Sequence, residues 1–201
     1  MKNTTLLILL SLFITSCGDN IREEITERYD DGKIKTIMKF IGENSEEVMI
    51  GKLVYSQSGD TLVWENYNSK GEKDGHWIGY IHAPINRLVK RNFKDGKEDG
   101  KWTSFYKNGQ IDTETNYKDG ELDGKWIHYN ENDGHLVSLQ NYRDGKKHGK
   151  TTSYYQNGQI KEEQNYKDDK WDGKWTQYDK NGKITFEGNY KNGKKINSKY
   201  Y

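Results

Sequence analysis

A short unit recurs along most of this chain, and it limits the possible folds more than any other feature of the sequence. The full units begin with an Asn and an aromatic residue and continue through two glycine turns and a Lys-Trp pair, as residues 116–140 show most clearly. Successive units are 24 to 26 residues apart and begin at Asn66, Asn92, Asn116, Asn141, Asn165 and Asn189. Repeats of this length cannot each bury a core of their own, so neighbouring units have to pack side by side.

Dipeptides that favour tight turns divide every unit into two short strands. In one unit these dipeptides are Asp119-Gly120, Asp123-Gly124 and Asp133-Gly134, and both residues of such a pair tolerate the positive φ of hairpin turns. The strands between them cover roughly 125–130 and 135–142. No connection is long enough for a crossover helix, so neighbouring strands are expected to be antiparallel. The sequence therefore predicts an all-β protein: an elongated single-layer antiparallel β-meander of hairpin repeats.

Side-chain parity predicts one apolar face and one polar face. In the second strand of each unit an aliphatic residue and an aromatic residue share parity, as Ile111 and Tyr117 do, and should project from the same face. Asp112, Glu114 and Asn116 alternate with them and should form the polar face. Only 31% of the residues are hydrophobic, but 15 Tyr and 6 Trp are present. Aromatic rings must therefore supply most of the apolar contacts.

The N-terminus has the features of an export signal. Lys2 precedes an apolar run over residues 6–14, which is shorter than the roughly 20 residues of a membrane-spanning helix. Cys17, the single cysteine, follows this run, which therefore resembles a bacterial lipoprotein signal with a lipidated cysteine. The resemblance implies a chain anchored through Cys17 in the bacterial cell envelope, at the outer membrane, on either its periplasmic or its outer side. The alternative is an ordinary secretory signal with a chance cysteine.

These features divide the chain into four segments. Residues 1–17 are the predicted signal, and residues 18–28 are expected to form a polar tether or a short helix. Residues 29–65 are expected to be a degenerate repeat with strands over 48–55 and 61–65. Residues 66–201 hold the tandem repeats.

The repeat resembles the MORN repeat, specifically its bacterial variant, whose units read Y-x-x-G-x-x-x-G-x-[WY]. The resemblance covers residues 64–201, through units at 67–77, 93–102, 117–126, 142–151 and 166–175. It implies an elongated antiparallel sheet without catalytic activity, and an antitoxin role in a toxin–antitoxin pair. Thr151 replaces the Trp, Asp169 replaces a Gly, and the first spacing is lengthened around Pro84. We expect irregular structure at these three places.

Composition and motifs argue against several classes of function. The net charge is +1, with 32 basic and 31 acidic side chains, which argues against binding to nucleic acid or to an acidic membrane surface. The five histidines lack metal-ligand spacing and are interpreted as solvated. Turn chemistry explains the paired aspartates of 95–100 and 119–124 better than calcium binding does. Catalysis needs one special place, whereas the carboxylates here recur from unit to unit. The sequence therefore predicts no catalytic residue, cofactor or metal site.

Tryptophan side chains mark the candidate binding surface, because Trp is enriched at binding hot spots. One position of the repeat holds a Trp in four units: Trp77, Trp102, Trp126 and Trp175. Trp171 has no Trp counterpart in the other units, so we expect it to be exposed and to contact a partner. The alternative is local packing that compensates for Asp169.

Three functions are compatible with these observations. The first is a non-catalytic, lipid-anchored envelope protein that presents an extended β surface to a protein partner. The second, implied by the family resemblance, is an antitoxin or immunity protein that masks a toxin. The third is a protein that binds cell-wall glycan.

Overall fold

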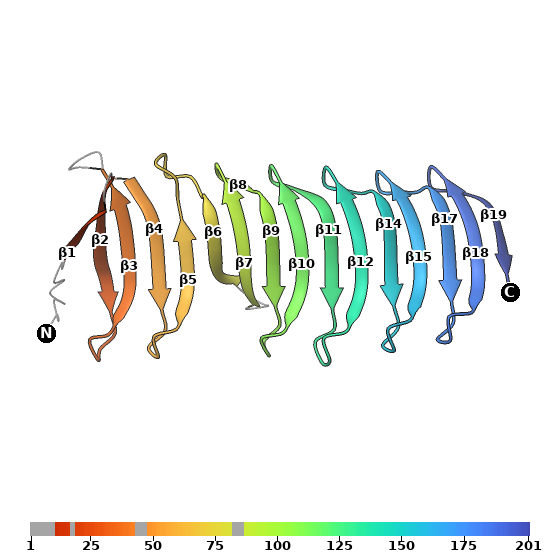
Figure 1. The fold of residues 1–201 in the computed structure, drawn as a ribbon, viewed down its shortest axis with the longest axis horizontal. Helices are drawn as coiled ribbons and strands as arrows, with labels where there is room; N and C mark the ends of the chain where they lie inside the picture. Colours follow the sequence, from red (N-terminus) through yellow and green to blue (C-terminus); the bar gives the residue numbers. More distant parts are fainter. Residues whose placement is uncertain (1–10, 17–18, 43–47, 82–86) are drawn as a thin grey trace, which may run out of the picture. The chain divides into compact units, whose positions relative to one another are not determined.

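The computed structural model describes residues 11–16, 19–42, 48–81 and 87–201. All regular elements in these ranges are β-strands, joined by turns and short loops (Figure 1). Contacts divide the chain into an N-terminal unit of residues 1–86 and 90–97, and a C-terminal unit of residues 87–89 and 98–201. The division falls within β7 (Arg87–Lys94) and β8 (Lys97–Glu98), whereas the sequence places the start of the tandem repeats at residue 66.

The N-terminal unit is an antiparallel meander in which each strand from β1 to β6 pairs with the next along the chain. Its strands are β1 (Ser11–Ser16), β2 (Asp19–Arg28), β3 (Ile34–Ile41), β4 (Val48–Tyr55), β5 (Thr61–Asn66) and β6 (Gly75–Ile81). Most of β7 follows them in the same unit. β4 and β5 confirm the two strands predicted within residues 29–65.

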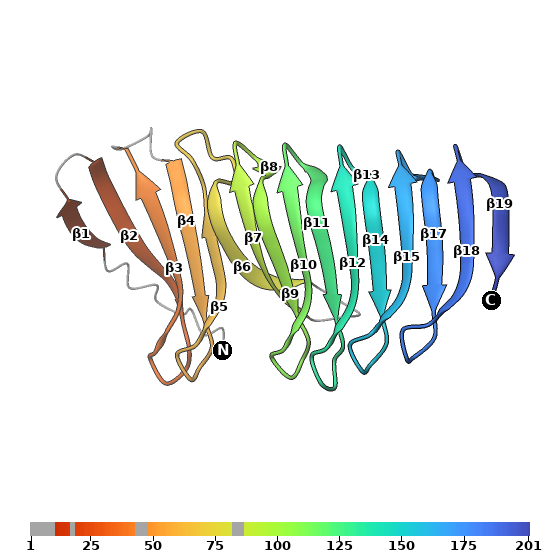
Figure 2. The ribbon, with the colours of Figure 1, turned by 45° about the vertical axis from the view of Figure 1, so that its right-hand side comes forward.

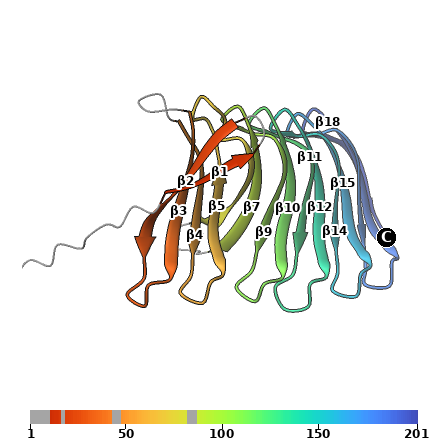
Figure 3. The same ribbon diagram turned by 60° about the vertical axis from the view of Figure 1, so that its left-hand side comes forward.

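Strand β2 corrects the expectation of a tether or short helix at residues 18–28. It pairs with β3 along most of its length and with β1 on its other side (Figure 3). Ile25 stands opposite Ile37, and the carboxylate of Glu23 pairs with Lys39 at 2.8 Å. Glu27 likewise pairs with Lys35 of β3, and Glu24 pairs with Arg22 of its own strand. The three glutamates that suggested a solvated tether are therefore paired with basic side chains of the sheet.

Strand β1 lies within the predicted signal segment and pairs with β2. Cys17, the predicted lipidation site, lies outside the described residues. Cleavage before Cys17 would remove β1 and leave β2 paired with β3 alone. In the ranges that the structure describes, no helix is long and apolar enough to span a bilayer.

The C-terminal unit is a second antiparallel meander, and its strands lie side by side in one layer (Figure 2). Its longer strands are β9 (Gly100–Phe105), β10 (Ile111–Lys118), β11 (Glu121–Tyr129), β12 (Leu136–Arg143), β14 (Gly149–Tyr154), β15 (Ile160–Lys167), β17 (Gly173–Tyr178), β18 (Ile184–Lys191) and β19 (Lys194–Tyr200). The two-residue strands β13 (Lys146–Lys147) and β16 (Lys170–Trp171) pair with the end of the strand before them. The predicted antiparallel meander of hairpins is confirmed.

The tight turns adopt the backbone that their dipeptides predict. In the turn between β10 and β11, φ is +52° at Asp119 and +91° at Gly120, as a type I′ hairpin turn requires. Asp169 replaces a Gly yet keeps a φ of +64°, and its N–H donates to Lys147 O at 3.0 Å as Gly120 N–H donates to Glu98 O at 2.8 Å. The expectation of irregular structure at Asp169 is therefore wrong, because Asp tolerates the left-handed conformation.

A side-chain hydrogen bond explains the Asn at the start of four units, Asn66, Asn116, Asn141 and Asn165, which sequence reasoning left without a role. Asn165 Nδ2 donates to the backbone oxygen of Lys174 at 2.8 Å, and Asn141 makes the same bond to Lys150. The glycine between them has a positive φ, +114° at Gly173, and a Cβ there would lie 3.1 Å from the Cβ of Asn165. The Asn and the Gly therefore depend on each other: the Asn side chain bonds to the backbone beside the Gly, and the Gly leaves room for that side chain.

A β-bulge in each hairpin overturns the parity prediction. Ile111 pairs with Phe105, but Thr113 pairs with Ser104, so β10 carries one extra residue between these pairs. The alternation of side chains reverses there. Ile111 is consequently 36% exposed, while Asp112, predicted for the polar face, is only 5% exposed.

The C-terminal unit consequently has two faces of different chemistry. We call the first the aromatic face; it carries Trp126 and Trp102, both of which pair with Thr115. We call the second the charged face; it carries Lys101 and Glu114. Phe186 and Tyr190 are among the most buried aromatic residues, at 5% and 8% exposure, yet among the described residues no large side chain is less than 2% exposed. A single-layer sheet leaves both faces open to solvent.

Candidate functional site

The structure places Trp171 in a ring cluster on the aromatic face. Its short strand pairs Trp171 with Tyr166, and its ring lies 5.1 Å from that of Trp175 and 5.0 Å from that of Tyr190. Trp171 is half-buried, so the expectation of an exposed Trp is wrong. The local packing that we considered as the alternative is what the structure shows.

A hydrogen-bond network holds this ring cluster in place. Trp171 Nε1 donates to Tyr166 OH at 2.8 Å, and Tyr166 OH donates to Gln164 Oε1 at 2.8 Å. Gln164 Nε2 donates to Glu162 Oε2 at 3.3 Å, and Trp175 Nε1 donates to the same oxygen at 3.2 Å. Both indole N–H groups are thus satisfied within the chain, which fixes the orientation of the rings.

The other predicted tryptophans form smaller aromatic contacts. Trp102 lies 5.1 Å from Tyr117, and Trp126 lies 5.7 Å from the ring of His128. Trp77 belongs to the N-terminal unit, where Lys73 Nζ lies 4.4 Å from its ring centroid. The row of the C-terminal unit therefore holds Trp102, Trp126 and Trp175 and does not include Trp77.

Thr151 interrupts the tryptophan row without disturbing the strand. The register of β14 against β15 is continuous from Gly149 to Ser153. The expected backbone irregularity at Thr151 is therefore wrong. The smaller side chain alters the surface of the aromatic face, but it leaves the backbone hydrogen bonding of the strand unchanged. The third expected irregularity, around Pro84, lies outside the described residues.

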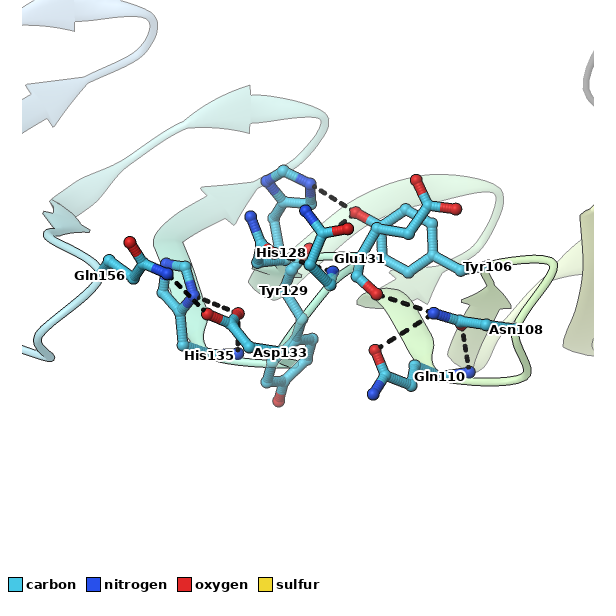
Figure 4. Close-up of polar contacts among 11 residues, drawn as sticks. Tyr106, Asn108, Gln110, His128, Tyr129, Glu131, Asp133, His135 and Gln156 are labelled. Atoms are coloured by element: carbon cyan, nitrogen blue, oxygen red, sulfur yellow. Dashed lines mark hydrogen bonds and ion pairs between the residues drawn. The ribbon is translucent and has the colours of Figure 1, made fainter.

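Turn residues of successive hairpins are tied together at one end of the sheet (Figure 4). Tyr106 OH donates to the backbone oxygen of Tyr129 at 2.7 Å, and Asn108 Nδ2 donates to that of Glu131 at 2.7 Å. Tyr155 and Asn157 repeat these bonds to Tyr178 and Lys180 in the later hairpins. These bonds hold each turn against the next one. They give the Tyr and Asn side chains of the turns a structural role, so no ligand is needed to explain why they are there.

Two histidines lie among these turns and are half-buried, although they were expected to be solvated. His135 Nδ1 lies 2.6 Å from Asp133 Oδ1, and this hydrogen bond lowers the pKa of Asp133 to about 2. His128 Nε2 lies 3.2 Å from Tyr106 OH. The first contact lies within one turn, and the second joins the end of β11 to the turn between β9 and β10.

Asp112 is a buried carboxylate that the bulge carries onto the aromatic face. Ser104 Oγ donates to it at 3.0 Å, Arg87 pairs with it, and His128 Nε2 lies 3.7 Å away. Burial, assisted by Asp112, raises the pKa of Tyr106 to about 12. A serine nucleophile needs a hydrogen bond to its base, whereas the Ser104 hydroxyl bonds to Asp112 and Thr113. The geometry is that of an ion pair between a buried carboxylate and a partly exposed Arg87, and not of a catalytic triad.

The charged face carries a repeated arrangement of a lysine, a glutamate and a tyrosine, which we call the Lys–Glu–Tyr ladder. Lys101 pairs with Glu114, whose other oxygen accepts a hydrogen bond from Tyr129 of the next hairpin at 3.3 Å. The same arrangement recurs at Lys150, Glu163 and Tyr178, and at Lys174, Glu187 and Tyr201. The Lys174 ammonium, followed by the Tyr201 hydroxyl, holds the pKa of Glu187 below its usual value. Sequence reasoning missed this ladder, although the glutamate follows the lysine by 13 residues in all three cases.

No metal centre accompanies these arrangements in the part of the chain that the structure describes: no group of three His, Cys, Asp or Glu side chains could hold an ion. The paired aspartates lie in turns whose backbone bonds account for them. An open hollow between two turns is lined by Asp119, Asp123 and Asp144, but Lys118 lines it as well.

Comparison with known families agrees with the repeated hairpins. Three segments match the MORN repeat variant. They are residues 98–119, 147–168 and 171–192. Each MORN match begins in one of the two-residue strands and ends in a tight turn of the next hairpin. The matched segments leave out residues 120–146, which contain the hairpin of β11 and β12.

Comparison with other proteins adds little. No curated protein matches the chain. A porin-like protein from Bacteroides uniformis is 12% identical, with 95% of this chain and 94% of that chain covered and a TM-score of 0.22. A chain of the TcdB2-TccC3-Cdc42 complex is also 12% identical, with a TM-score of 0.18, but only 13% of its length is covered. Structural likeness this weak supports no conclusion about function.

Proposed function

We propose that this chain is a non-catalytic, lipid-anchored repeat protein of the bacterial envelope that presents the β surface of its MORN repeats to another protein. The observation that carries the proposal is the open C-terminal sheet, in which no large described side chain is less than 2% exposed. Both faces therefore offer aromatic and charged side chains, held in fixed positions by hydrogen bonds. Rigid aromatic and charged groups favour binding because little conformational entropy is lost.

The lipid anchor is the first part of this proposal, and the sequence of residues 6–14 followed by Cys17 supports it. A cysteine carrying two or more acyl chains would attach the chain stably to a membrane. Labelled palmitate should enter the full-length protein expressed in a bacterium, and Cys17→Ser should abolish both the label and the membrane fraction. Unchanged membrane association in the variant would contradict the anchor.

The protein partner is the second part. Affinity capture from envelope extracts with the full-length protein should retain one protein in a fixed ratio. Its sequence would also test the antitoxin role that the family resemblance implies, because the partner would then be a toxin. Capture of no protein would overturn the proposal.

Glycan binding is the alternative that one observation favours. Trp171, Trp175 and Tyr190 form an aromatic cluster beside Glu162 and Gln164, and such side chains can stack on and hydrogen-bond to sugars. Retention of the protein on cell-wall polysaccharide, lost in Trp171→Ala, would support this alternative. Both indole N–H groups bond within the chain, so protein binding remains our first proposal.

A further inference from the structure

The hairpin of β11 and β12 breaks the Lys–Glu–Tyr ladder. At the position of Glu114, Glu163 and Glu187 it carries Leu139, because β11 and β12 place Leu139 opposite Ile127 as β9 and β10 place Glu114 opposite Thr103. Ile127 likewise takes the position that Thr103, Thr152 and Thr176 occupy in the other hairpins. The charged face is therefore locally apolar at this one hairpin.

The break leaves a lysine and a tyrosine without the carboxylate that their counterparts have. Lys125 occupies the ladder position of Lys101, Lys150 and Lys174, and Tyr154 that of Tyr129 and Tyr178. Within residues 87–201, all of which the structure describes, the Lys125 ammonium makes no ion pair and the Tyr154 hydroxyl makes no hydrogen bond. A cation and a hydroxyl donor thus flank an apolar patch.

The same hairpin departs from the repeat in a second way. It lies in residues 120–146, which the matches to the MORN repeat variant leave out, although the segments before and after it both match. A residue that serves the repeat recurs in it, whereas Ile127 and Leu139 do not. The strand pairing of β11 and β12 is nevertheless continuous from Gly124 to His128. The hairpin therefore has the same backbone pairing as the other hairpins, but different side chains on its charged face.

We propose that Lys125, Ile127, Leu139 and Tyr154, the Leu139 site, bind an acidic side chain of a protein partner, flanked by apolar residues of that partner. This inference rests on the proposed function and names the chemistry of the partner. The incoming carboxylate takes the place of the missing glutamate between the Lys125 ammonium and the Tyr154 hydroxyl. Its apolar neighbours cover Ile127 and Leu139. Charge complementarity selects the acidic partner, because the ladder shows three times how this face receives a carboxylate.

Leu139→Glu is the decisive variant, since it supplies the missing carboxylate from within the chain. It should fill the ladder position, repel an incoming acid and keep the fold, which circular dichroism would check. Ile111→Glu is the matched control: it adds the same charge to another aliphatic position of the C-terminal unit, 36% exposed and at the start of β10.

Random short peptides displayed on phage provide a defined probe for the full-length protein. Selection on the wild type, with counter-selection on Leu139→Glu, should enrich peptides that share an Asp or Glu flanked by apolar residues. These peptides should bind about tenfold more weakly to Leu139→Glu, and about tenfold more weakly when their acid is replaced by its amide. Ile111→Glu should bind them as the wild type does.

The possible outcomes separate this inference from the proposed function. Peptides that bind Leu139→Glu and the wild type equally, or that tolerate the amide, would overturn the Leu139 site while leaving a protein-binding surface elsewhere. Absence of any enriched peptide would also overturn it. Failure of the proposed function itself would be seen separately, as the absence of any captured protein in envelope extracts.

Discussion

At the scale of single residues, the repeat is maintained by pairs of side chains and turns that act together. Asn165 bonds to the backbone of Lys174 across Gly173, and the glycine has both a positive φ and a close neighbour. Asp119 and its counterparts accept the left-handed conformation in the adjoining turn. Each unit is therefore specified by a few positions where another residue would be strained.

We predict that Gly173→Ala destabilises the protein more than Gly158→Ala does. Both glycines have positive φ, +114° and +81°, but a Cβ on Gly158 meets nothing within 4 Å, whereas one on Gly173 meets Asn165 at 3.1 Å. Gly158→Ala should cost about 1 kcal/mol through its backbone alone, and Gly173→Ala about 2 kcal/mol or more. Denaturant unfolding of both variants measures the difference; equal losses would show that Asn165 simply moves aside.

We predict that ionisation of Tyr106 makes the stability of the protein depend on pH in the alkaline range. Its pKa is raised from 10 to about 12, first by burial and then by Asp112, so folding favours the neutral phenol. The stability from this group is fully present below pH 10 and is lost as the pH rises towards about 12. In Tyr106→Phe the loss of stability over that interval should be shallower. Urea unfolding at several pH values would show this, and parallel curves for the two proteins would contradict it.

At the scale of elements, the structure differs from the sequence prediction where strands meet. The Asp-Gly turns could be predicted because they depend on local backbone preferences, and the repeat then fixed the antiparallel meander. The bulge at Ile111 and Asp112 could not, because it arises from the register between two strands. The packing of Trp171 against Trp175 and Tyr190 also depends on neighbouring strands. The Lys–Glu–Tyr ladder could have been found from the recurrence of its residues.

Strand β2 gives a prediction at this scale. The structure pairs Glu23 with Lys39 and Ile25 with Ile37 across β2 and β3, so the amides between them should exchange slowly. Hydrogen exchange of the full-length protein should show protection of at least about a hundredfold over an unstructured chain. The exposed strand β19, whose side chains all lie at the surface, provides a comparison. If the amides of β2 exchanged at the rate of an unstructured peptide, residues 18–28 would be a tether, as the sequence predicts, and not a strand.

At the scale of the whole molecule, each part of the sheet depends mainly on its neighbours. In the C-terminal unit, strands pair with those beside them in the chain, and hydrogen bonds such as those from Tyr129 to Glu114 and from Tyr178 to Glu163 join adjacent hairpins. The stability of such a stack is approximately a sum of local and nearest-neighbour contributions. Damage at one hairpin should therefore spread only a short distance, which bears on how variants in binding experiments are interpreted.

Trp171→Ala tests this locality and clarifies the binding experiments. Removing a half-buried ring that contacts Trp175 and Tyr190 should cost about 2 kcal/mol. Amide exchange should become faster in β15 to β18, and it should stay unchanged in β9 and β10 of the same unit. Equal acceleration in all these strands would mean that the sheet unfolds as one body. With local damage, a partner that Trp171→Ala still binds must contact the sheet elsewhere, and the Leu139 site between β9 and β15 is then the region to examine.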